Sequence, residues 1–110
     1  MYVSIESKAT KTHYKEILEE TREIAMSHLE KLRDEPLDSP AHIVWTSILN
    51  QINDIQDNIV DNSIITEWQD IYKRYTVGLI GLQAFDDNDE MQLRLNDIFY
   101  GAVHYNEFPD

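Results

Sequence analysis

The side chains of this chain that could do chemistry are 21 carboxylates and four histidines, and their spacing matches no metal site of helical proteins. Di-metal sites in helical bundles use a Glu placed three residues before a His on facing helices. The residues found three positions before the four histidines are instead Thr10, Ala25, Ser39 and Gly101. The chain has no cysteine, which excludes disulfides, thiolate metal sites and cysteine nucleophiles. We therefore predict no metal site.

The densest group of carboxylates is the segment Asp86–Glu90, which shares only its composition with a calcium loop. It lacks the alternating ligand spacing, the central Gly and the distal Glu of such a loop, so we interpret it as a turn and helix cap. A nucleophile elbow, a phosphate-binding loop and a dinucleotide fingerprint are all missing from the sequence. His28 falls on an apolar helical stripe, which is typical of a core or boundary histidine. The sequence therefore predicts a protein that is not an enzyme and uses no cofactor.

The net charge of −12 is distributed unevenly along the chain. Residues 1–33 contain six acids and six bases and are neutral overall, whereas residues 34–110 contain fifteen acids and only three bases. A surface of one sign attracts partners of the other sign, and phosphate binding needs clustered Lys and Arg. We therefore expect a basic protein partner and no nucleic acid. The longest apolar run, residues 77–82, is far shorter than the ~20 residues of a membrane span, so no membrane association is expected either.

Apolar residues recur at three- and four-residue steps in four segments, which predicts four helices. Their expected ranges are 10–32, 40–61, 64 or 67 to 85, and 87 or 88 to 104. Ser39 is expected to cap the second helix, with Pro40 at its first position. Residues 1–9 would form an extended arm or a frayed start, and residues 105–110 an extended tail. These elements predict one domain over residues 1–110, an all-α antiparallel bundle of about four helices.

The stripes also predict which side chains face the core. Five aromatic residues lie on them and are expected to point inward: Tyr14, Trp68, Tyr72, Tyr75 and Phe99. Trp45 is less certain in position, because the second stripe can pass through Val44 and leave Trp45 partly exposed as an interface anchor. Gly78 and Gly81 lie inside a predicted helix, where each costs about 1 kcal/mol relative to Ala. Two glycines three residues apart indicate that another helix packs closely there.

One local pattern resembles a known family. The run Thr76, Gly78, Ile80, Phe85 and Asp86 follows a T-x-G-x-I-x-x-x-x-F-D pattern, with an acidic turn and a further helix after it. It resembles the C-terminal half of the small all-helical immunity family of bacterial type VI secretion, whose best-known member neutralises an NAD(P)+-glycohydrolase effector. The resemblance covers about 30 residues of the chain, and its later positions are Leu93, Leu95, Asp97, Tyr100 and Gly101.

The resemblance implies a protein that binds a cognate toxin in the cytoplasm of the producing cell and blocks its active site. Relatives are paired with toxins of differing chemistry, so the family does not define the toxin class. An enzyme that binds NAD or nucleotide phosphates in a basic cleft would suit this acidic chain, since complementary charge speeds capture. Eight residues are the expected toxin contacts: Asp86, Asp87, Asp89, Glu90, Asp54, Asp57, Asp61 and Trp45.

Two other functions remain open at this point. An acidic adaptor or nucleic-acid mimic could occupy a DNA-binding protein, and it would need carboxylates spaced like phosphates along one face. A homo-oligomeric structural bundle would instead self-associate without a partner. The neighbouring gene would discriminate the first function from immunity, because a toxin gene beside this one favours immunity.

Overall fold

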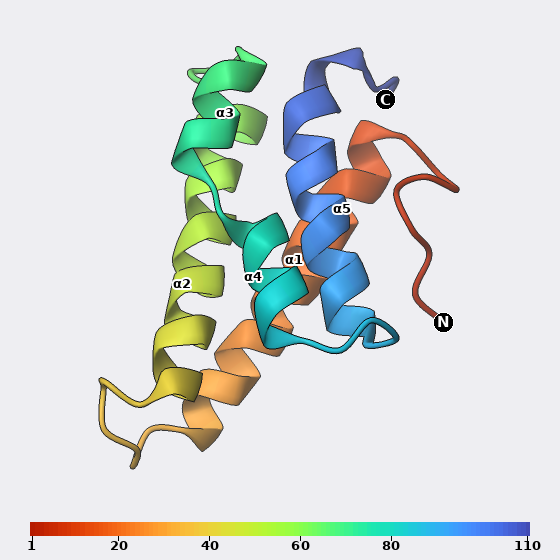
Figure 1. The fold of residues 1–110 in the computed structure, drawn as a ribbon. Helices are drawn as coiled ribbons and strands as arrows, with labels where there is room; N and C mark the ends of the chain where they lie inside the picture. The colour runs from red at the N-terminus through yellow and green to blue at the C-terminus, as the bar shows by residue number, and fades with distance from the viewer.

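The computed structural model describes residues 1–110 and is all-α, without any strand. Five α-helices are accompanied by a short π-helix and a short 3₁₀-helix (Figure 1). In chain order they are α1 (Lys11–Lys31), α2 (Pro40–Ile55), the π-helix η1 (Gln56–Asp61), α3 (Trp68–Arg74), α4 (Val77–Ala84), α5 (Glu90–His104) and the 3₁₀-helix η2 (Tyr105–Glu107). The predicted fold class is therefore confirmed.

The two long helices α1 and α2 form an antiparallel pair, and the cap predicted at Ser39 is confirmed. The Thr10 hydroxyl accepts a hydrogen bond from the His13 amide at 3.0 Å, and the Ser39 hydroxyl accepts one from the His42 amide at 3.3 Å. Pro40 follows at the first helical position, where a missing N–H costs nothing. The loop that joins the two helices projects at the lower end in Figure 1 and is exposed.

The second helix winds to Asp61 as predicted, but its last six residues form a π-helix. Side-chain amides bind the backbone carbonyls of this segment: Asn58 donates to the Asp54 carbonyl at 3.1 Å and Asn62 to the Asp57 carbonyl at 2.7 Å. Such side-chain bonds compete with the regular i−4 ladder and favour a wider turn. The apolar periodicity of the sequence carries no signal for this local change.

The third predicted helix is wrong as a single element, because it is broken at Tyr75 and Thr76 into α3 and α4. Tyr75 is extended, with φ −114° and ψ 135°. Tyr75 and Val77 are both buried, and residues two apart on one helix would face opposite sides. The Gln51 side chain stabilises the break: its oxygen accepts from the Thr76 amide at 2.7 Å, and its amide donates to the Thr76 hydroxyl at 2.9 Å.

The last helix, α5, packs against α4 at Gly78 and Gly81, the two glycines where close helix packing was predicted. A Cβ on Gly78 would lie 3.4 Å from the Cβ of Phe99, and one on Gly81 would lie 3.3 Å from the Cβ of Leu95. This close approach confirms the predicted helix packing. The expected extended tail is wrong at residues 105–107, where the chain adds the turn η2 before Phe108 is buried.

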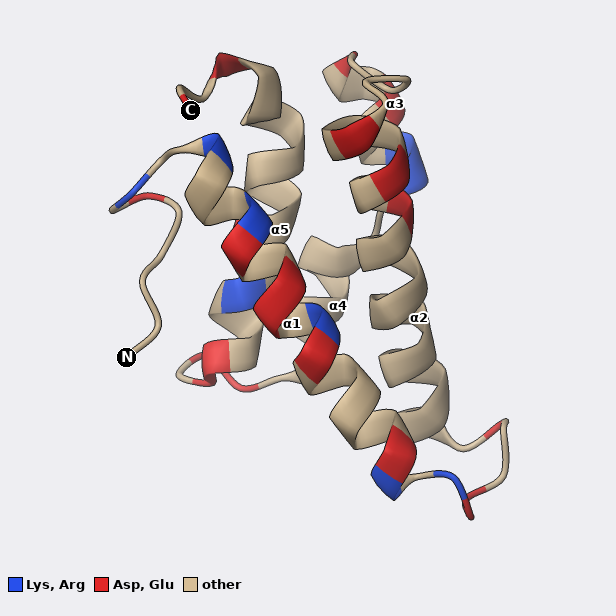
Figure 2. Cartoon of the chain, turned by 180° about the vertical axis from the view of Figure 1, so that it is seen from behind, with Lys and Arg blue, Asp and Glu red and all other residues tan.

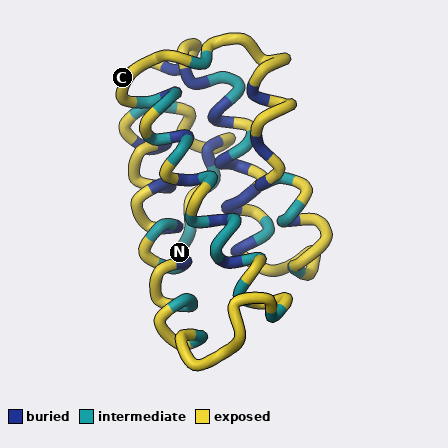
Figure 3. Tube along the Cα trace, turned by 90° about the vertical axis from the view of Figure 1, so that its left-hand side faces the viewer, coloured by how far each residue is buried: buried dark blue, intermediate teal, exposed yellow.

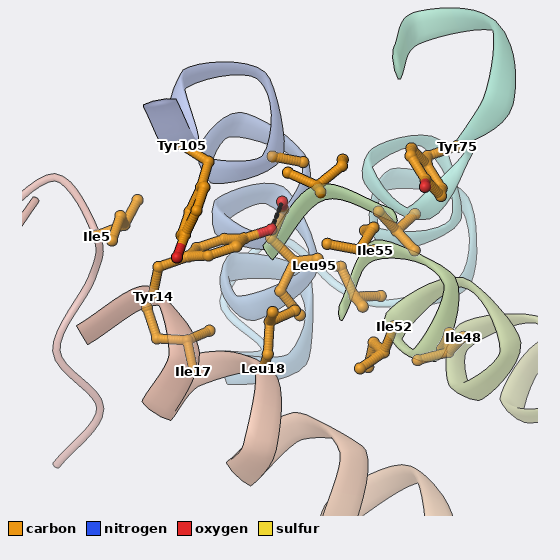
Figure 4. Close-up of a cluster of buried hydrophobic side chains, with 14 of the residues drawn as sticks. Ile5, Tyr14, Ile17, Leu18, Ile48, Ile52, Ile55, Tyr75, Leu95 and Tyr105 are labelled. Atoms are coloured by element: carbon orange, nitrogen blue, oxygen red, sulfur yellow. Dashed lines mark hydrogen bonds between the residues drawn. The ribbon is translucent and has the colours of Figure 1, made fainter. Parts of the chain in front are cut away.

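The core runs between α1, α2 and α5 and is rich in isoleucine (Figure 4). Tyr14 is fully buried in it and reaches across from α1 to donate a hydrogen bond of 2.7 Å to the Ile98 carbonyl. Its ring packs at an angle on those of Tyr105 and Phe108. Buried positions recur along the inner sides of the helices, while the connecting loops are exposed (Figure 3). None of the helices combines the length and the apolar character that crossing a membrane would need.

The N-terminal arm is anchored beside α5 rather than frayed. Ile5 is fully buried, and the buried carboxylate of Asp97 accepts hydrogen bonds from the Tyr2 hydroxyl at 2.6 Å, the Ser4 hydroxyl at 3.2 Å and the Ile5 amide at 3.3 Å. The N-terminus therefore lies on the α5 side of the molecule, and the C-terminus, which follows α5, lies on the same side (Figure 1).

Candidate protein-interaction face

The acidic turn between α4 and α5 presents the densest exposed carboxylates of the chain. Two of its four acids, Asp89 and Glu90, also make contacts that stabilise the fold. Asp89 caps α5 by accepting a hydrogen bond from the Met91 amide at 2.8 Å, and Glu90 accepts one from Arg94 Nε at 2.9 Å. Asp86 and Asp87 are exposed and form no ion pair. No side-chain hydrogen bond involves Asp86, and Asp87 accepts only one, from Gln92 Nε2 at 3.4 Å, so both carboxylates can face a partner.

A groove of about 470 Å³ lies beside the acidic turn, between α4 and α5. The apolar side chains along it are Leu82 and Leu93, which are 68% and 43% exposed. Its acidic rim consists of Asp87, Asp89 and Glu90, and no Lys lines it. We call this combination of exposed leucines and rim carboxylates the acidic groove. Exposed apolar area beside uncompensated charge is the composition expected of a surface that binds a basic protein.

Arg94 compensates one of the three rim acids, Glu90, and leaves Asp87 and Asp89 without an ion pair. Its guanidinium is buried and bonds Glu90, Glu20 and the Thr21 hydroxyl. It also lies 4.4 Å from the centre of the Tyr2 ring, a cation–π contact. These contacts tie α5, α1 and the arm together, so Arg94 is a structural residue.

The acidic residues expected on the second helix lie at the other end of the molecule. Asp54 belongs to α2, and Asp57 and Asp61 belong to η1; this end of the second helix lies beside α3, away from the link between α4 and α5 (Figure 1). The structure therefore does not bring the two predicted acidic groups into one contact surface. Asp57 and Asp61 are exposed, and Asp61 accepts a hydrogen bond of 2.8 Å from Gln56.

Asp54 is already paired within the chain. Its two oxygens accept from Arg74 at 2.6 Å and 2.8 Å, a bidentate arrangement, and Asn58 donates to it at 2.8 Å. The hydrogen bond from Arg74 holds the pKa of Asp54 below its ordinary value. Its charge is compensated, so Asp54 is a poor candidate for contact with a basic partner.

Trp45 is not an exposed anchor, because it is only 8% exposed. Its ring stacks on His28 with centroids 4.0 Å apart and meets the Phe85 ring edge at 5.5 Å. His28 is thus a boundary residue, as the sequence predicted. Three aromatic residues are exposed: Trp68 at 55%, Tyr72 at 58% and Tyr100 at 42%. The prediction that Trp68 and Tyr72 face the core is therefore wrong. The break after α3 turns their stripe away from the core, and no sequence signal marks it.

The largest depression of the molecule, about 860 Å³, lies between the N-terminal arm and α1. Its walls carry His13, Glu16, Glu20, Glu23 and Arg94. Arg94 pairs with Glu20 there, and His13 Nε2 lies 2.7 Å from the Val3 carbonyl of the arm. No three His, Asp or Glu side chains of the chain converge as a set of metal ligands.

Comparisons of the chain with protein-family models, with curated proteins and with solved structures find no match.

Proposed function

We propose that this protein is an immunity protein that captures a basic antibacterial toxin domain and blocks its active site in the producing cell. The observation that carries the proposal is the acidic groove, where uncompensated carboxylates border exposed leucines. Carboxylates such as Asp86 and Asp87 would steer a positively lined cleft to the protein, and Leu82 would bury apolar area once the two surfaces meet. The run Thr76–Asp86, on which the resemblance begins, leads into this same turn.

The alternative of a nucleic-acid mimic receives less support from the arrangement of charge. A mimic needs a row of uncompensated carboxylates along one face. The acids of the longest helix alternate with bases, and Glu19 pairs with Arg22 while Glu20 pairs with Arg94 (Figure 2). Charge concentrated at a corner beside apolar area suits a protein cleft better than the track of a nucleic-acid backbone.

The proposal is tested by two matched charge reversals. The first variant is Asp86→Lys with Asp87→Lys, and the control is Asp57→Lys with Asp61→Lys at the other end of the molecule. Each pair changes the net charge by the same amount, from −12 to −8, because each Asp→Lys adds two positive units. Candidate toxin domains, beginning with the product of the neighbouring gene, are co-expressed with each variant, and growth is scored.

We expect the first variant to lose protection and the control to keep it. For the purified pair at low salt, the association rate should fall about 10- to 100-fold for the first variant, and several-fold less for the control, because steering depends on where the charge lies. Circular dichroism checks that both variants fold. Equal protection by the two variants would show that the acidic groove is not the contact. Binding that double-stranded DNA competes away would favour the mimic instead.

A further inference from the structure

A second pocket of about 470 Å³ lies between the start of α3 and the end of α5, away from the acidic turn (Figure 1). Two aromatic rings, Trp68 and Tyr72, form one wall, and Val103 lies on the α5 side. Glu67 and Glu107 supply its carboxylates. The remaining residues that line it are Thr66, His104 and Asn106. We call this set the aromatic pocket.

The planes of the two rings lie nearly at a right angle to each other. The Trp68 and Tyr72 planes meet at 88° with centroids 5.6 Å apart. Behind them, Phe99 meets the Tyr72 ring at 85° and 4.9 Å, which holds Tyr72 in place from the α5 side. Trp68 and Tyr72 are each more than half exposed, so a ligand can reach part of each ring. Ring faces carry negative potential and attract cations that lie over them.

The charge around the aromatic pocket also favours a cation. Both of its carboxylates are exposed, and its only basic side chain is His104, which lies within ion-pair distance of Glu107. The two bases of α3 lie outside the pocket: Lys73 and Arg74 line a separate depression with Ile64 and Asp70, and Arg74 is bound to Asp54. His104 bonds Glu107, so an incoming cation would compete with it there, whereas no side chain of the protein bonds Glu67.

We infer that the aromatic pocket binds an arginine side chain of the captured partner protein. A guanidinium is planar, so it can stack on one ring while its edge N–H groups bond a carboxylate, which the compact ammonium of lysine cannot do in the same way. The inference rests on the proposed function for the source of the arginine, but the pocket can be tested without any toxin. It adds to the acidic groove a second contact that selects arginine rather than positive charge in general.

The test titrates the full chain with the peptide acetyl-Gly-Arg-Gly-amide and with its lysine counterpart. Binding is read from the indole N–H resonance of Trp68, and that of the buried Trp45 serves as an internal control. We expect saturable shifts at Trp68 with a Kd in the range of about 1–10 mM, and at least about five-fold weaker binding of the lysine peptide. Trp45 should not shift. In Trp68→Ala, the shifts at the Val103 amide should disappear, and Glu107→Gln should weaken binding several-fold.

Equal affinity for the two peptides, or shifts that persist in Trp68→Ala, would overturn the inference. Resonance shifts at Trp68 that depend on protein concentration alone would also overturn it, because they would show a second copy of the chain on this surface. The two proposals fail separately. If the Asp86→Lys, Asp87→Lys variant still protects while the arginine peptide binds as expected, the acidic groove fails and the aromatic pocket stands. If the arginine peptide does not bind while Asp86→Lys, Asp87→Lys still abolishes protection, the aromatic pocket fails and the acidic groove stands.

Discussion

Substituting Gly101 by Ala should destabilise the protein, although the same change is usually favourable in a helix. Gly101 lies in α5, and a Cβ placed there would lie 2.3 Å from Cε1 and 2.4 Å from Cδ1 of the Tyr14 ring. Carbon atoms in contact normally lie about 3.5–4.0 Å apart, so the ring or the helix must move by more than about 1 Å. Tyr14 is fully buried and hydrogen-bonded to the Ile98 carbonyl, so it cannot swing into solvent.

The expected size follows from three contributions. Overpacking a core costs about 1–3 kcal/mol, and displacing the buried Tyr14 hydrogen bond costs about 1–2 kcal/mol more. Replacing a helical Gly by Ala returns about 1 kcal/mol. The net loss in free energy of unfolding for Gly101→Ala should therefore be about 2.5 kcal/mol, within a range of about 1–4 kcal/mol. For a chain of 110 residues this corresponds to a decrease in Tm of roughly 10 °C or more.

Gly78→Ala is the matched control, because it makes the same chemical change in a neighbouring helix. Its Cβ would lie 3.4 Å from the nearest atom, Phe99 Cβ, which is ordinary contact. This variant should be neutral or stabilised by up to about 1 kcal/mol. Both variants are measured by urea unfolding followed by circular dichroism at 222 nm. If Gly101→Ala proved as stable as the wild type, the close packing of Tyr14 on α5 would be refuted.

Two further predictions concern the buried polar groups. Asp97→Ala leaves the Ile5 amide and the Tyr2 hydroxyl without their acceptor, so it should lower the free energy of unfolding by about 2–4 kcal/mol. It should also speed limited proteolysis of the N-terminal arm. Unchanged cleavage would contradict an anchored arm. Burial raises the pKa of Tyr2, Tyr14 and Tyr75, with a further contribution at Tyr2 from the hydrogen bond to Asp97, so the native state keeps these phenols neutral. Their contribution to stability is complete below about pH 10, the ordinary tyrosine pKa, and is lost as the pH rises above it. Absorbance at 295 nm should show these phenols ionising together with unfolding, whereas ionisation in a folded chain would contradict the burial.

Three of the four predicted helices, α1, α2 and α5, were predictable because helical periodicity is a local property. The stripes of α1, α2 and α5 repeat over four or more turns, and the caps at Thr10 and Ser39 use only neighbouring residues. The break at Tyr75 and Thr76 could not be predicted in this way, because it depends on Gln51, which lies 25 positions before Thr76. A contact between distant residues leaves no periodic signal in a single sequence.

For the candidate site, too, local features could be predicted from the sequence and contacts between distant residues could not. The sequence alone determined that charge is concentrated after residue 33 and that Asp86–Glu90 forms a turn, because composition and capping preference are properties of neighbouring residues. Only the tertiary structure decided which carboxylates remain uncompensated and which aromatic residues are exposed. Helix packing pairs Asp54 with Arg74 and stacks Trp45 on His28, and the break after α3 leaves Trp68 exposed. Burial and ion pairing depend on neighbours in space, so they follow from the packed arrangement of the helices and not from the order of residues along any one of them.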